Sequence, residues 1–107
     1  MSQLIMRLWR KMMNLTEKNR IKRPGLPDLI EIIAQYEVYQ RQLPKRLSGD
    51  VDYDNLKIRI NKKQTSRDKT ATLIHEAIHV YYMDRGWDAP EKIIVRQEKR
   101  LMKEWYK

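Results

Sequence analysis

Apolar residues recur every three or four positions near the start of the chain. This stripe comprises Leu4, Ile5, Leu8, Trp9, Met12, Met13 and Leu15. Arg7, Arg10 and Lys11 occupy the remaining face, so residues 2–20 are predicted to form a basic amphipathic helix. Two prolines and a glycine within residues 24–27 then interrupt the pattern. We therefore divide the chain into residues 1–25, a basic amphipathic helix with a hinge, and residues 26–107, a single further domain.

The hydrophobic period changes twice between residues 28 and 61. Apolar residues at helical spacing over 28–35 predict a short helix, and alternation over 36–41 predicts a strand. Turn residues at 48–50 lead into a second alternating stretch, in which Leu56, Ile58 and Ile60 share one face. We expect a hairpin over 51–61 with one buried face, and a small antiparallel sheet.

Two further helices are predicted after residue 61. The first is capped by Ser66 or Thr65 and runs to Arg85, with Gly86 as its stop. The second is capped by Asp88 and contains Pro90 and Glu91 in its first turn. The buried stripe of the first helix consists of Ala71, Ile74, Ile78 and Tyr81. Helices combined with a small sheet predict an α+β fold around one core.

Composition limits the chemistry that the chain can perform. Its 107 residues include no cysteine, so a metal must be held by histidine, aspartate or glutamate. No apolar run approaches the roughly 18 residues of a membrane span, and we expect a cytoplasmic protein. The net charge is +9, and ten basic against four acidic side chains lie within residues 1–47. This excess makes nucleic acid a candidate partner of the basic N-terminal helix.

The only two histidines lie in the sequence His75-Glu76-Ala77-Ile78-His79, an H-E-x-x-H motif. Residues four apart on a helix return to within about 40° of each other, so both imidazoles project from one face and can bind a single ion. Glu76 lies near enough to reach a metal-bound water without being a ligand. The motif is typical of hydrolysis at zinc, with His75 and His79 as ligands and Glu76 as general base.

A third zinc ligand must be a carboxylate, because the chain has no further histidine and no cysteine. If the second helix is antiparallel to the first, it reaches the level of the metal only after running back over the part of the first helix that lies beyond His79. This distance favours Glu98, which lies well inside the second helix. Glu91 is the alternative, although the pattern Asp88-x-x-Glu91 gives it a capping role in the first turn of the second helix.

The motif, followed by a glutamate on a second helix, resembles the gluzincin zinc metallopeptidases. The stretches Gly49–Asp54, Lys57–Asn61 and Thr72–His79 also resemble the small ImmA/IrrE-like metallopeptidases of phages and mobile elements. This resemblance covers residues 36–107. It implies a minimal zincin-like domain, in which a small twisted sheet lies above an active-site helix and a glutamate-bearing helix lies behind.

The resemblance also implies a ligand set and a substrate class. Zn²⁺ would be held by His75, His79 and Glu98, and Glu76 would act as the catalytic base. The substrate would be a protein or peptide, and some relatives act on a repressor. The alternative function is a non-catalytic metal-binding protein, or a nucleic-acid or partner-binding protein, of a phage or mobile element.

The presence of Glu76 favours the peptidase, because a purely structural metal site needs ligands but no carboxylate beside the metal-bound water. We expect a substrate backbone to add as a strand to the edge of Lys57–Asn61. Candidate donors to the oxyanion of the reaction are Tyr53, Tyr81, Tyr82 and Arg96.

Overall fold

The computed structural model describes residues 21–107. Its elements are α2 (Leu26–Gln35), β1 (Glu37–Arg41), β2 (Gly49–Asp52), β3 (Lys57–Asn61), α3 (Ser66–Asp84) and α4 (Glu91–Trp105). The predicted α+β class is confirmed for this part of the chain, and so are the short helix and the strand that follows it. The basic helix predicted over residues 2–20 lies outside the described residues.

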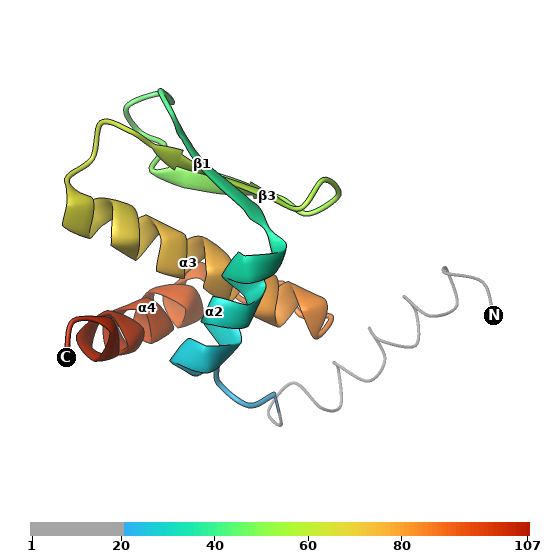
Figure 1. The fold of residues 1–107 in the computed structure, drawn as a ribbon. Coiled ribbons are helices and arrows are strands. Elements are labelled where there is room, and N and C mark those ends of the chain that lie inside the picture. Colours follow the sequence, from blue (N-terminus) through green and yellow to red (C-terminus); the bar gives the residue numbers. More distant parts are fainter. Residues whose placement is uncertain (1–20) are drawn as a thin grey trace.

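Helix α3 lies between the sheet on one side and the helices α2 and α4 on the other (Figure 1). Ile74, Ile78 and Tyr81 of the predicted stripe are buried, with exposed fractions of 0%, 0% and 3%. They pack with Leu29 of α2 and Ile94 of α4 into one core. Because this buried face is packed into the core, the orientation of the adjacent face of α3, which carries the histidines, is fixed as well.

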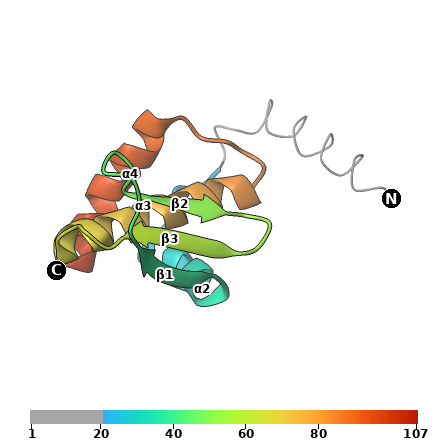
Figure 2. The same cartoon turned by 90° about the horizontal axis from the view of Figure 1, so that it is seen from above.

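The sheet is mixed, with the strand order β1-β3-β2 (Figure 2). The predicted hairpin is confirmed, because β2 pairs antiparallel with β3. The expectation of a wholly antiparallel sheet is wrong, because β1 pairs parallel with β3. Strand β3 takes the central position, where Ile58 and Ile60 are covered. Lys57–Asn61 consequently has no free edge, and the edges of the described sheet belong to β1 and β2.

A buried amide explains how the chain passes from β1 to the far edge of the sheet. Asn61 is 4% exposed, and its Nδ2 donates to the carbonyl oxygens of Leu43 and Leu47 at 3.2 and 3.0 Å. These bonds fix the connection over residues 42–48 at the end of β3. The connection therefore leads β2 to the opposite side of β3 from β1.

The ends of α3 agree with the sequence prediction, whereas the start of α4 does not. Thr65 Oγ1 accepts a hydrogen bond from the backbone N–H of Asp68 at 3.1 Å, and Gly86, with φ 80°, follows the end of the helix. Helix α4 begins at Glu91 with Pro90 as its cap, so the expected cap at Asp88 is wrong. The Glu91 side chain is consequently not part of a capping box.

Gly49 brings β2 into close contact with α3. A Cβ atom at this position would lie 2.5 Å from the carbonyl oxygen of Arg59 and 2.6 Å from Cγ2 of Thr72. We expect Gly49→Ala to lower the free energy of unfolding by about 1 to 3 kcal/mol, measured by urea denaturation. Gly25→Ala is the matched control, because the nearest atoms to its Cβ lie at 3.6 Å. Equal losses in both variants would contradict this role of Gly49.

Candidate metal centre

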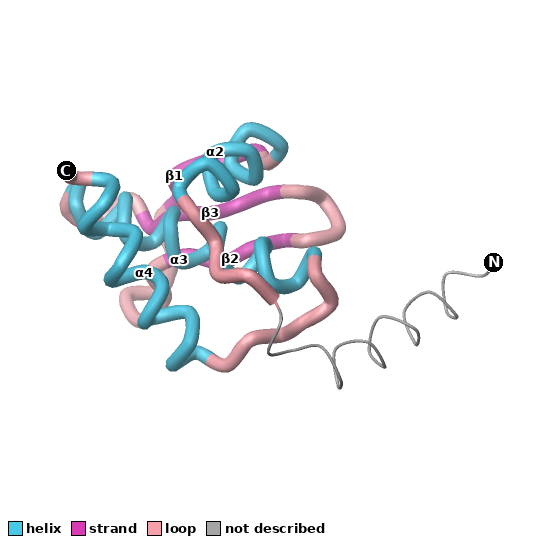
Figure 3. The backbone as a smooth tube through the Cα atoms, turned by 90° about the horizontal axis from the view of Figure 1, so that it is seen from below, coloured by secondary structure: helices cyan, strands magenta, loops and turns pink. Residues whose placement is uncertain are grey.

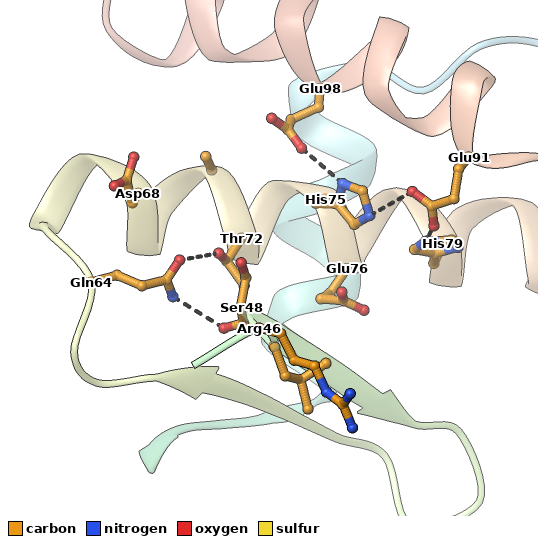
Figure 4. Close-up of a pocket in the computed structure, with 13 residues that line it drawn as sticks. Arg46, Ser48, Gln64, Asp68, Thr72, His75, Glu76, His79, Glu91 and Glu98 are labelled. Atoms are coloured by element: carbon orange, nitrogen blue, oxygen red, sulfur yellow. Dashed lines mark hydrogen bonds and ion pairs between the residues drawn. The ribbon is translucent and has the colours of Figure 1, made fainter. Parts of the chain in front are cut away.

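Three side chains from two helices converge beside the first turn of α4. His75 and His79 lie one turn apart on α3, with ring centroids 5.0 Å apart. His79 Nε2 lies 2.8 Å from Glu91 Oε1, and His75 Nε2 lies 3.2 Å from Glu91 Oε2 (Figure 4). Potential ligand atoms of the three residues all lie within 4.8 Å of one another. Two imidazoles and one carboxylate thus face a common point.

Glu98 lies on the other side of the His75 ring. It follows Glu91 by seven residues, so both side chains project from the same face of α4. Its Oε1 is 2.8 Å from His75 Nδ1, the ring nitrogen that does not face Glu91 (Figure 4). The sequence favoured Glu98 as the third ligand, but the structure brings Glu91 to both Nε2 atoms and places Glu98 against the back of His75.

The connection over residues 85–90 accounts for this arrangement. It returns the chain along the last turns of α3, so that the first turn of α4 is already level with His79. Two turns later, α4 reaches the level of His75. The return path of α4 is thus shorter than the sequence predicts, and the predicted capping role of Glu91 is not found.

The charges around His75 favour its protonated form in the metal-free protein. Burial opposes protonation, but the hydrogen bond to Glu98 and the negative charges of Glu76, Glu91 and Glu98 outweigh it, so the pKa of His75 is raised. The same negative potential attracts a cation to this point.

Glu76 projects from the side of α3 that faces the sheet, next to His75 (Figure 4). Burial is the largest cause that raises its pKa to about 7, and the carboxylates of Asp50 and Glu91 add to this shift. His75 acts in the opposite direction. A carboxyl group with a pKa near 7 is suited to accept and return a proton at neutral pH.

A groove of about 610 Å³ extends from this cluster along α3. The rest of its lining comes from the connection before β2, from the start of β2, from the turn after β3 and from the first turns of α3. These residues are Arg46, Leu47, Ser48, Gly49, Gln64, Asp68, Ala71 and Thr72. Gln64 fixes one wall, because its amide donates to the Ser48 carbonyl oxygen at 3.0 Å and accepts from Thr72 Oγ1 at 2.9 Å. Sequence reasoning did not identify these wall residues, since they belong to separate segments and form no motif.

The candidate oxyanion donors differ widely in position. Tyr81 and Tyr82 are each 3% exposed and belong to the core, and Tyr81 Oη donates to the Lys22 carbonyl oxygen. Arg96 lines a separate groove on α4. Tyr53, in the turn between β2 and β3, is 36% exposed, and burial followed by the charge of Glu76 raises its pKa to about 12. Of the three candidate tyrosines, Tyr53 alone is exposed, and the charge of Glu76 contributes to its raised pKa.

Comparison with protein-family models, curated proteins and solved structures finds no match for the chain. Within residues 21–107, no helix combines the length and the apolar character needed to cross a bilayer.

Proposed function

We propose that this protein is a zinc-dependent metallopeptidase that hydrolyses peptide bonds of a protein substrate. The observation that supports this most strongly is the convergence of His75, His79 and Glu91 in a groove that also contains Glu76. Two histidines and one glutamate are a ligand set used by catalytic zinc sites, which keep a fourth position for water or substrate. The layered arrangement of sheet, α3 and α4 is compatible with a minimal zincin-like fold.

The donor set fits zinc better than it fits magnesium or calcium, because those ions prefer oxygen ligands. Zinc would be held by Nε2 of His75, Nε2 of His79 and the Glu91 carboxylate. When bound, zinc supplies a Lewis acid that polarises a carbonyl group and makes water nucleophilic near pH 7. Glu98 accepts a hydrogen bond from Nδ1–H of His75, which leaves Nε2 free to act as a ligand.

Glu76 moves the protons of the proposed reaction. It takes a proton from the attacking water and delivers it to the leaving nitrogen, which is the role of a general acid–base carboxyl group. Tyr53 would keep its proton at neutral pH, because its pKa is about 12, but it does not line the groove and we assign it no role in the reaction.

The substrate would lie along β2. This strand is an edge of the described sheet, and Gly49 at its start lines the groove. An extended peptide can add to such an edge through backbone hydrogen bonds, which places its own backbone beside α3. The recognition surface expected at Lys57–Asn61 is thus reassigned to β2.

A zinc titration of the chelator-treated chain tests the proposal. We expect one zinc per chain in the wild type, and a loss of about two to three orders of magnitude in affinity in His79→Ala, because one ligand is removed. Lys69→Ala is the control on the same helix, outside the groove. The zinc-loaded wild type is then incubated with a peptide library and the cleaved peptides are identified by mass spectrometry.

Failure of the wild type to bind zinc would overturn the proposal. Stoichiometric zinc binding with no cleavage above that of the zinc-free chain would instead favour a non-catalytic metal-binding protein.

A further inference from the structure

Helix α4 has a second charged face in addition to the one that carries Glu91 and Glu98. At 100° per residue, these two glutamates lie within about 20° of each other around the helix axis. A second set of residues lies in an arc of about 60° whose centre is about 120° away. This set, called here the basic ridge, consists of Lys92, Arg96, Lys99 and Lys103.

The basic ridge borders a shallow groove of about 520 Å³ on the outer side of α4, separate from the metal centre. Val95 supplies the apolar part of its lining, and Arg100 completes the lining. All four side chains of the ridge belong to exposed residues. Helix α4 runs along one side of the molecule, so a long ligand can approach this groove (Figure 3).

Within the part of the chain that the structure describes, the four cations of the ridge have no partner, unlike Arg59 and Arg100. Arg59 is paired with Asp50, and Arg100 is bound to Pro24 and Glu104. Within residues 21–107, by contrast, no hydrogen bond or ion pair engages the side chains of Lys92, Arg96, Lys99 and Lys103. Four like charges on one helix face repel each other, which makes an external polyanion a favourable partner.

We propose that the basic ridge binds the phosphate backbone of double-stranded nucleic acid. From Lys92 to Lys103 the ridge extends about 16 Å along the helix axis. One strand of a duplex presents a phosphate about every 3.4 Å along its axis, so this length corresponds to about five phosphates. No acidic side chain lines the groove, so each cation of the ridge can meet an anion.

Two features of the groove distinguish a duplex from other anionic partners. Binding of single strands depends on aromatic side chains that stack with bases, and no aromatic residue lines this groove. Docking of an acidic protein normally needs an apolar centre, and Val95 alone, 36% exposed, supplies little of one. The binding is therefore directed to phosphates and independent of base sequence.

The ridge is tested with the full chain and a labelled 20-base-pair DNA duplex of arbitrary sequence, by fluorescence anisotropy between 50 and 200 mM salt. We expect Arg96→Gln/Lys99→Gln to weaken binding about tenfold at the lowest salt, and to reduce the slope of log K against log salt by about 1.8. The control Lys45→Gln/Lys62→Gln removes the same charge from exposed positions outside the ridge groove. It is expected to change binding less than threefold.

The outcomes separate the ridge from other sources of binding. A larger loss in the ridge variant than in the control supports the proposal, and an RNA duplex measured in parallel shows which nucleic acid is preferred. Equal losses in both variants overturn it, because the effect is then one of total charge. Unlabelled duplex and polyglutamate are also compared as competitors of the labelled duplex. If polyglutamate competes as strongly per charge as the unlabelled duplex, the proposal is overturned in favour of an acidic protein partner. All titrations contain chelator, so the result does not depend on the zinc site.

Discussion

Glu76→Gln is expected to reduce kcat for peptide hydrolysis by about 10²- to 10⁴-fold while the chain still binds one zinc. The amide keeps the size of the side chain but cannot accept the proton of the attacking water. Glu76 is not among the three residues that could hold the metal, so its substitution leaves the ligand set intact. The measurement pairs the rate of hydrolysis with zinc content in the same preparation.

Asp68→Asn is a suitable control, because it removes another carboxylate from the lining of the same groove. Asp68 lies eight residues before Glu76, which is about 12 Å along α3. Hydrolysis by the control is expected to stay within about threefold of the wild type. An unchanged rate in Glu76→Gln, or an equal loss in Asp68→Asn, would exclude Glu76 as the base.

The same variant has a distinct effect on the stability of the metal-free protein. Glu76 has a pKa of about 7 in the folded state against a usual value of 4.5, so the folded state binds the proton more tightly. The contribution of this group to the free energy of unfolding is therefore fully present below pH 4.5 and is lost as the pH rises to 7. Between these pH values, the free energy of unfolding of Glu76→Gln should rise by about 2 to 3 kcal/mol relative to that of the wild type. If the free energy of unfolding depended on pH in the same way in both proteins, the raised pKa of Glu76 would be contradicted.

Local features of the fold could be predicted from the sequence because neighbouring residues determine them. The Thr65 cap, the stop at Gly86 and the buried positions Ile74 and Ile78 all follow from spacing within one helix. The same spacing placed His75 and His79 on one face, so two of the three residues that could hold a metal share a face as the sequence predicts.

Features that depend on distant contacts could not be predicted in the same way. The parallel pairing of β1 with β3 accompanies the bonds of the buried Asn61 amide to carbonyl groups 14 and 18 residues away. The position of Glu91 depends on the path of residues 85–90, which has no hydrophobic period. Helical spacing puts Glu91 and Glu98 on one face of α4, but it does not determine which of them meets both histidines.

The two glutamates are expected to differ in how they affect zinc affinity. Structural zinc sites gain about 10 to 16 kcal/mol from four ligands, so one ligand accounts for about 3 kcal/mol. We therefore expect Glu91→Ala to weaken zinc binding by about two to three orders of magnitude, measured by competition with a chromophoric chelator. Glu98→Ala removes only the hydrogen bond to His75 Nδ1, and its expected effect is about 10- to 100-fold.

Substitution by glutamine separates the two roles more sharply than alanine does. In Glu98→Gln the amide oxygen can still accept a hydrogen bond from Nδ1–H of His75. Its zinc affinity should therefore stay within about threefold of that of the wild type. In Glu91→Gln the loss should persist, because a neutral amide replaces the charged ligand that faces both Nε2 atoms. Recovery in Glu91→Gln together with persistent loss in Glu98→Gln would reverse the assignment and make Glu98 the third ligand. The Nδ1 contact of Glu98 would then have to break when zinc binds, because a carboxylate oxygen bound there cannot also face the point that His79 and Glu91 share.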